Sequence, residues 1–175
     1  MILSMNNLIA EGGFSDIFAI DSQVFKIFIS SRHTRCAQND RGEVENDFRR
    51  QAFRSELHAW QIASKHDILR NFIPDFFGEI IIKQVENSNG VDISIHYLLE
   101  CCYSMAKIDA PVSKFEALRG QFNQIEPMMH SVGIRHTIDM SGFLLDDGTK
   151  IKLIDFATED AYYNAECAWI ASTQE

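Results

Sequence analysis

Three short stretches decide the fold, and they follow one another along the chain as IAEGGFSDIF (residues 9–18), QVFK (residues 23–26) and KLIDFA (residues 152–157). The first is a glycine-rich turn between apolar residues. The second places Lys26 among apolar neighbours, and the third places Asp155 after two apolar residues. Any one of these patterns is weak evidence alone. Their order and surroundings together are specific, and they predict a glycine-turn hairpin, a strand lysine and a strand-end aspartate.

The residues around the first two stretches predict an antiparallel sheet interrupted by one helix. β-Branched and aromatic residues flank the turn signal at Asp21 and Ser22, which is typical of consecutive antiparallel strands. Residues 30–46 are polar and lack periodicity, so we expect an exposed loop there. Apolar residues at three- and four-residue steps then predict an amphipathic helix from about Asp47 to Ser64.

The rest of the chain predicts shorter elements. We expect strands at residues 76–82 and 93–99 around a turn at 87–90. A second helix of about five turns should end near residues 132–133, and Pro127 should kink it or separate its last turn. A hairpin of residues 143–145 with 151–154 follows, and then a short helix in the final segment.

Composition limits the class of protein. The 175 residues are 46% hydrophobic and include 13 Phe, which predicts a packed core rather than disorder. The net charge of −9 argues against a nucleic-acid surface, because phosphate backbones select clustered Lys and Arg. No apolar run approaches the roughly 20 residues that span a bilayer. The four cysteines follow no C-x-x-C spacing and no secretory leader, so we expect a soluble protein with free thiols.

The glycine-rich turn has the chemistry of a phosphate-binding loop. Small residues let backbone N–H groups approach phosphate oxygens without a Cβ in the way. Gly12 occupies the central position of a G-x-G-x-x-G pattern, whose other two glycines are replaced here. The candidate nucleotide-binding residues of this stretch are Ala10, Gly12, Gly13, Ser15 and Ile17. An ordinary hairpin turn accounts for the stretch equally well.

Lys26 is the candidate that binds phosphate. A lysine among apolar strand residues is costly unless its ammonium meets an anion. For its carboxylate partner we choose Glu56, which shares a helix face with Trp60, over Glu43 and Glu45, which lie in the polar stretch. The alternative is an exposed strand lysine and a solvated helix glutamate.

Together these segments resemble the protein-kinase-like fold from about residue 8 to residue 156. The resemblance implies an α+β, two-lobed fold in a single minimal domain. Residues 1–102 would form an antiparallel sheet with one helix and the hinge, and residues 103–175 a truncated, mostly helical lobe. The short chain and the tail EDAYY (residues 159–163) are further similar to the minimal kinases that bacterial type III secretion systems inject, the OspG-like effectors. That likeness implies a bacterial cytoplasmic protein that is later secreted into a host cell.

The resemblance also implies roles for individual residues and the cofactors ATP and Mg²⁺. Lys26 would bind phosphates and pair with Glu56, and Asp155 would hold the metal. YLLECC (residues 97–102) resembles a strand that runs into the hinge. Adenine would be bound there by the backbone of Leu99, Glu100 and Cys101. A buried strand end is an equally good interpretation of that stretch.

The segment GIRHTIDMSGFLL (residues 133–145) is close to the kinase catalytic loop but altered. Anchored at its N-terminal end, it has Ile138 where the catalytic aspartate is expected and Asp139 one residue later. Anchored at its C-terminal end, it has Thr137 there and Gly142 where the metal-binding asparagine is expected. Asp139 is therefore the candidate that orients the substrate hydroxyl, and a solvated loop residue is the alternative.

Three functional hypotheses follow from these residues. The first is a Ser/Thr protein kinase that phosphorylates a host protein through Lys26, Glu56, Asp139 and Asp155. The second is a pseudokinase, a binding or scaffolding module whose altered loop no longer transfers phosphate. The third, phosphotransfer to a small molecule, is weakened by the short C-terminal lobe. The sequence does not name the substrate, the partner or the oligomeric state.

Overall fold

The computed structural model describes residues 1–36, 42–109, 115–136, 143–145 and 151–158. The chain divides into two compact units that interleave along the sequence. The first unit comprises Met1–Phe53 and Phe77–Met105, and the second comprises Arg54–Phe76 and Ala106–Glu175. The long helix α1 (Gly42–Lys65) contributes residues to both units.

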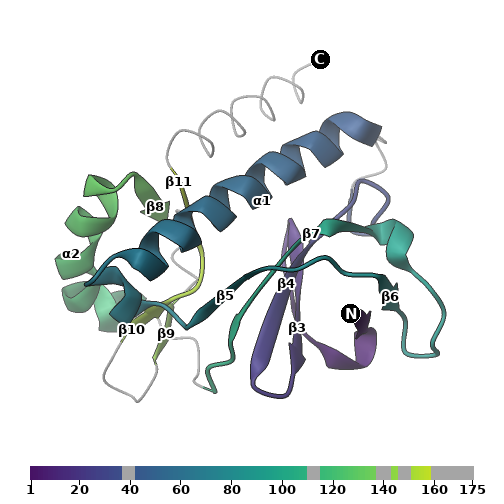
Figure 1. The fold of residues 1–175 in the computed structure, drawn as a ribbon, viewed down its shortest axis with the longest axis horizontal. Coiled ribbons are helices and arrows are strands. Elements are labelled where there is room, and N and C mark those ends of the chain that lie inside the picture. Colours follow the sequence, from purple (N-terminus) through teal and green to yellow (C-terminus); the bar gives the residue numbers. More distant parts are fainter. Residues whose placement is uncertain (37–41, 110–114, 137–142, 146–150, 159–175) are drawn as a thin grey trace. The chain divides into compact units, whose positions relative to one another are not determined.

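The first unit is built on a five-stranded sheet (Figure 1) with the strand order β2-β3-β4-β7-β5. The strands are β2 (Leu8–Glu11), β3 (Ser15–Ile20), β4 (Gln23–Ile29), β7 (Tyr97–Ala106) and β5 (Phe76–Glu79). Strands β2, β3 and β4 form the antiparallel meander that the sequence predicts. Asp21 and Ser22 join β3 to β4, and Asp21 has a φ of 51°, as tight hairpin turns require. The predicted hairpin is confirmed.

Apolar residues cover both faces of this sheet. On one face lies a buried cluster that includes β1 (Ile2–Ser4), which pairs in parallel with β6 (Gln84–Glu86). The fully buried members of the cluster are Leu3, Phe18, Phe25, Ile27, Ile29, Ile82, Val85, Tyr97 and Cys102. On the opposite face the ring of Phe28 meets that of Phe53 in α1, with centroids 5.6 Å apart. The first half of α1 therefore packs on the face that carries Phe28.

Helix α1 begins earlier than predicted. The sequence indicated a start at Asp47, whereas the helix begins at Gly42. Its first turns are polar but internally paired, since Arg49 binds Glu45 at 2.5 Å and Arg50 binds Glu43. Acidic residues in a first turn also complement the helix dipole. Ion pairs thus stabilise helical turns in a stretch that has no helical pattern of apolar residues.

The two strands predicted after Pro74 have different bounds from those expected. Strand β5 ends at Glu79, although Ile80 and Ile82 still donate backbone hydrogen bonds to Cys102 and Leu99. Residues 93–99 are not one strand, because η3 (Ser94–His96) is a 3₁₀ helix that β7 follows. The carboxylate of Asp92 accepts from the Ser94 N–H at 2.8 Å and so favours a turn there.

The second unit holds the C-terminal half of α1 and the remaining elements. These are η2 (Leu69–Phe72), α2 (Phe115–Ser131), β8 (Ile134–His136), β9 (Phe143–Leu145), β10 (Ile151–Leu153) and β11 (Phe156–Thr158). Strands β9 and β10 pair antiparallel, as predicted. Helix α2 ends before Gly133, whose φ of 76° suits a helix C-terminus, and it runs through Pro127 without separating its last turn.

Trp60 organises the core of the second unit. Its ring stacks on Phe76 at a centroid distance of 5.4 Å and on Phe156 at 4.6 Å. Within the described ranges no helix is long and apolar enough to cross a membrane. The described cysteines, Cys36, Cys101 and Cys102, are free thiols, as expected. Cys167 and the helix expected in the final segment lie outside the described residues.

Candidate functional site

Lys26 lies in a row of side chains that crosses three strands. Ala10 of β2 is paired with Ile17 of β3, and Ile17 is paired with Lys26 of β4. Directly paired residues of neighbouring strands project from the same face of a sheet. Ala10 is exposed, Ile17 is half-buried, and Lys26 is only 8% exposed. Three residues proposed from the sequence therefore share one face, with the ammonium at its buried end.

The same face carries Phe28, two residues after Lys26 on β4. The ammonium of Lys26 lies 5.7 Å from the centroid of the Phe28 ring. Ser15, another candidate, is paired with Phe28 and is buried. The face is thus mostly apolar apart from one cation. Phe28 is fully buried against Phe53 of α1, so the accessible apolar surface of this face comes from Ala10 and Ile17. Apolar surface beside a cation can accept a planar ring and an anionic group together.

The glycine turn joins β2 to β3 and is closed by its own backbone. Gly12 N–H donates to the Ser15 carbonyl at 2.8 Å, and a Cβ on Gly12 would lie 3.1 Å from that oxygen. Gly13 has no atom within 4 Å of a Cβ built on it. The closed hairpin therefore favours a glycine at position 12, whereas Gly13 lies in an open position where a ligand can approach the backbone.

Two arginines bind the carbonyls of this turn. Arg35 Nη1 donates to Gly12 O at 2.7 Å, and Arg49 Nη1 donates to Gly13 O at 3.2 Å. The guanidinium of Arg49 also lies 5.3 Å from the ring centroid of Phe14, which in turn contacts Phe48 of α1. Neither arginine was a candidate in the sequence, because Arg35 falls in the polar stretch of residues 30–46 and Arg49 in the first turn of the predicted helix, both without a recognisable motif.

Asp16 is a further residue that sequence reasoning missed. It is fully buried, pairs with Arg35, and accepts a hydrogen bond from Tyr97 Oη at 2.9 Å. Burial and the neighbouring carboxylate raise the pKa of Tyr97. A signal was present, since Asp16 shares a strand face with Phe18, a core residue. A charge on the core face of a strand needs a partner.

His33 completes this buried polar group. Its Nδ1 accepts from the backbone N–H of Arg35 at 3.2 Å, and its Nε2 lies 3.7 Å from the carboxylate of Asp16. An acceptor Nδ1 requires the neutral ring with the proton on Nε2. Burial, and next the positive charge of Arg35, lower the pKa of His33, although Asp16 opposes the shift.

Asp155 lies in the second unit, between β10 and β11. Strand β11 pairs with β8, and the register places Phe156 opposite His136. Phe156, the residue after Asp155, is therefore paired with a residue of the altered catalytic segment (residues 133–145). Asp139 itself lies outside the described residues. The strand after Asp155 and the strand before Asp139 are thus neighbours in the structure.

Contacts from α1 and η2 fix the strands on both sides of Asp155. Thr158 N–H donates to Ser55 Oγ at 3.0 Å. Lys152 Nζ donates to the carbonyls of Asn71 and Ile73 at 3.1 and 3.0 Å. Phe156 is 1% exposed. Because pairing and packing hold the segment, Asp155 has a defined position at a strand end.

The predicted hinge residues lie within a strand. Strand β7 continues to Ala106, so Leu99, Glu100 and Cys101 are not at a strand end. The carbonyl of Leu99 accepts from Ile82 N–H at 3.0 Å, and the carboxylate of Glu100 binds Arg50 at 2.9 Å. A strand that leads into a hinge loop would reach it only after Ala106. The apolar and thiol-rich run after Glu100 extends the strand beyond the predicted end.

Known proteins provide one informative comparison. No family model and no curated protein matches the chain. The crystal structure of WbdD, a kinase-like bacterial protein, is similar at 13% identity with a TM-score of 0.54 over 88% of this chain. A co-crystal structure of WbdD with the kinase inhibitor LY294002 is similar at 11% identity and a TM-score of 0.48, covering 91% of this chain and 34% of that chain. The chain has a protein-kinase-like α+β fold.

The likeness concerns the fold alone, and this chain covers 33% of the WbdD chain.

Lys26 belongs to the first unit, whereas Glu56 and Asp155 belong to the second. Glu56 follows Phe53 by three residues, so both lie on one side of α1. The pairing of Lys26 with Glu56 stays a prediction. Among the described residues no group of three or more His, Cys, Asp or Glu could hold a metal by itself.

Proposed function

We propose that the chain binds ATP with Mg²⁺ and transfers a phosphoryl group to a Ser or Thr hydroxyl of a protein. The observation that carries the proposal is the row formed by Ala10, Ile17 and Lys26 beside the glycine turn. Lys26 is only 8% exposed, and a buried positive charge on an apolar face is favourable for binding anionic phosphate oxygens. A nucleotide has both an apolar ring and an anionic tail.

The available donors fit a nucleotide with its metal. Lys26 supplies a positive charge for phosphate oxygens, and the glycine turn supplies backbone N–H groups. Asp155 supplies a carboxylate, which is a sufficient protein contribution because Mg²⁺ keeps several waters and takes its other ligands from phosphates. When bound, the metal would neutralise the charge that develops on the transferred group. Adenine recognition by the backbone of Leu99, Glu100 and Cys101, which lie within β7, stays a prediction.

The finer predictions rest on the sequence alone. A host protein as substrate, and injection by a bacterial secretion system, depend on the similarity of chain length and tail to effector kinases. Transfer also requires that Asp139 reaches the substrate hydroxyl from a rearranged loop. Nucleotide binding can be tested independently of the host substrate, of secretion and of the role of Asp139.

A second candidate function is a pseudokinase that binds a protein partner. The observation that favours it is the catalytic segment, in which Ile138 or Thr137 replaces the aspartate and Gly142 replaces the asparagine. Phosphoryl transfer depends mostly on positioning and charge neutralisation, so the loss of both groups is severe. In this case nucleotide binding would persist for stability alone or would be absent.

The test combines binding with transfer in one preparation. Thermal shift with ATP and Mg²⁺ measures binding, because a ligand that binds only the folded state raises the melting temperature. Radiolabelled transfer to the protein itself and to candidate proteins measures activity. The variants are Lys26→Met, Asp155→Ala and Asp139→Ala, with the exposed helix residue Lys65→Met as the matched control. Lys26→Met removes the charge and keeps a side chain of similar length, and the melting temperature without ligand checks that the variant folds.

We expect the thermal shift to vanish in Lys26→Met, to lose its Mg²⁺ dependence in Asp155→Ala, and to persist in the Lys65→Met control. Transfer that needs Asp139 supports the kinase. Binding without transfer supports the pseudokinase. A wild-type protein that remains folded and shows no shift at millimolar nucleotide overturns nucleotide binding altogether.

A further inference from the structure

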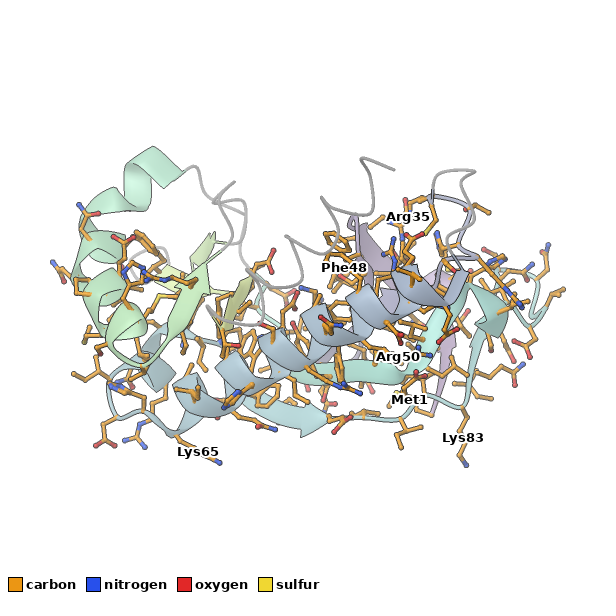
Figure 2. The ribbon with its side chains drawn as sticks, turned by 90° about the horizontal axis from the view of Figure 1, so that it is seen from above. Met1, Arg35, Phe48, Arg50, Lys65 and Lys83 are labelled. Atoms are coloured by element: carbon orange, nitrogen blue, oxygen red, sulfur yellow. The ribbon has the colours of Figure 1, made fainter. Side chains whose placement is uncertain are left out.

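The glycine loop, defined here as residues 12–14, is held by side chains from two other segments. Arg35 comes from the segment after β4 and binds Gly12 O, and Arg49 comes from α1 and binds Gly13 O. Figure 2 shows Arg35 and Phe48 on one side of the first turns of α1 and Arg50 on the other. The carbonyls of Gly12 and Gly13 are therefore bound by guanidinium groups, whereas that of Phe14 accepts from the Ile29 N–H.

The two arginines are themselves fixed. Arg35 pairs with the buried carboxylate of Asp16, and its guanidinium bridges that carboxylate and the loop. Arg49 has a side chain only 6% exposed, and it binds Glu45 at 2.5 Å as well as Gly13. A planar guanidinium with several donors in fixed directions can hold two acceptors in a defined geometry, which a lysine cannot do.

Peptide geometry turns these contacts into an orientation. In a trans peptide the C=O of one residue and the N–H of the next point in opposite directions. Arginines on the carbonyls of Gly12 and Gly13 therefore direct the N–H groups of Gly13 and Phe14 away from the arginine side. Within the part of the chain that the structure describes, neither N–H donates to a protein acceptor. Both residues are exposed.

We propose that Arg35 and Arg49 are positioning residues, which hold the glycine loop so that the Gly13 and Phe14 N–H groups meet nucleotide phosphates. The inference rests on the proposed function. It adds that Arg35 and Arg49 fix the conformation of a loop in which Ala10 and Ser15 replace two glycines of the G-x-G-x-x-G pattern. A loop with one central glycine pair is oriented by arginine contacts to its carbonyls rather than by its own sequence.

The experiment separates positioning from a merely structural role by comparing ligands with and without phosphates. The dissociation constants of ATP with Mg²⁺ and of adenosine are measured for wild type, Arg35→Lys and Arg49→Lys. Arg50→Lys is the matched control, because Arg50 binds Glu43, Asp47 and Glu100 and not the loop. In the same proteins, ¹⁵N relaxation reports the order of the Gly13 and Phe14 amides.

Loss of one charge-assisted contact should weaken ATP binding about tenfold and leave adenosine binding within about twofold. The order parameters of both amides should fall from the rigid range, about 0.85, toward about 0.6 in the two loop variants and stay unchanged in Arg50→Lys. Equal weakening of ATP and adenosine would mean a general loss of structure and would overturn the inference. Unchanged order parameters would overturn it as well.

The failure of the proposed function gives a different result. If wild type binds neither ligand, nucleotide binding and the phosphate-directed role of the arginines are both wrong. Relaxation measured on the same samples still decides whether Arg35 and Arg49 hold the loop. The two failures are therefore distinguishable, because one appears in wild type and the other only in the variants.

Discussion

The two neighbouring glycines of the turn have different physical roles. A Cβ on Gly12 would lie 3.1 Å from the backbone oxygen of Ser15, whereas one on Gly13 meets nothing within 4 Å. Neither residue has a positive φ. Gly12→Ala should therefore lower stability by about 1 kcal/mol, or roughly 2–4 °C in melting temperature, because the Ser15 carbonyl must shift slightly to admit the methyl group.

Gly13→Ala is the matched control for that prediction. It should leave the melting temperature unchanged or raise it by a few degrees, because alanine restricts the unfolded chain where the native conformation admits it. Differential scanning calorimetry of both variants checks the pair. A larger loss in Gly13→Ala than in Gly12→Ala would contradict the assignment of Gly12 to the hairpin closure.

His33 should make stability depend on pH. Burial, followed by the charge of Arg35, lowers its pKa below the usual 6.5, against the opposing effect of Asp16. As the pH falls through the unfolded value, the unfolded chain takes up a proton that the folded chain still refuses. The stabilisation is thus complete above the unfolded pKa and is lost as the pH falls through the lower folded pKa.

The measurement compares melting temperatures at about pH 7.5 and about pH 5.5 for wild type and His33→Asn. The asparagine carbonyl can still accept from the Arg35 N–H, so the variant keeps the neutral contact while losing the titration. Wild type should lose more stability on acidification than His33→Asn does. The neighbouring ionisable residues Asp16, His96 and Glu11 are common to both proteins. Parallel pH profiles would disprove the role of His33.

At the scale of elements, Ser55 connects α1 to the strand that follows Asp155. Its hydroxyl accepts from Thr158 N–H at 3.0 Å and can donate to Thr158 O at 3.2 Å, and its side chain is buried. Ser55→Ala should lower the melting temperature by roughly 2–4 °C, since a buried N–H and a carbonyl lose their partner. Hydrogen exchange should rise in residues 156–158.

Ser64→Ala is the control for the Ser55 variant. Both serines lie in α1, so the gain in helix propensity from alanine is the same, but Ser64 bonds only to Gln61 of its own helix. Ser64→Ala should leave exchange in β11 unchanged. An equal effect of the two substitutions would show that helix propensity, and not the contact with Thr158, is what was measured.

Element prediction succeeded where one local signal decides and failed where distant partners decide. The Asp21-Ser22 turn and the β9–β10 pairing follow from turn chemistry and apolar alternation, and both are confirmed. The start of α1 was wrong because ion pairs such as Glu45 with Arg49 carry no hydrophobic period. The end of the strand that begins at Tyr97 was placed too early, because the strand continues to Ala106 through a further apolar run.

For the whole molecule, the sequence indicated the fold class but not the polar groups that support the candidate site. The glycine turn, Lys26 and Asp155 follow one another in the order typical of kinases, and this order suffices to predict a kinase-like fold. Asp16 and Arg35 form a pair only after the sheet and the following segment have folded. Such contacts between residues of different segments have no local pattern, so a single sequence cannot predict them.

The net charge of the whole chain, −9, makes a final prediction about kinetics. A nucleotide with its metal is still an anion, so the field of the protein as a whole repels it at long range, and added salt screens that repulsion. The association rate should therefore rise as ionic strength increases from about 0.02 to about 0.2 M. The dissociation rate should also rise, because Lys26 and the phosphates attract each other less strongly in salt. Stopped-flow fluorescence with a labelled ATP analogue measures both rates. An association rate that falls with salt would mean that the local positive field of Lys26, Arg35 and Arg49 outweighs the charge of the rest of the molecule.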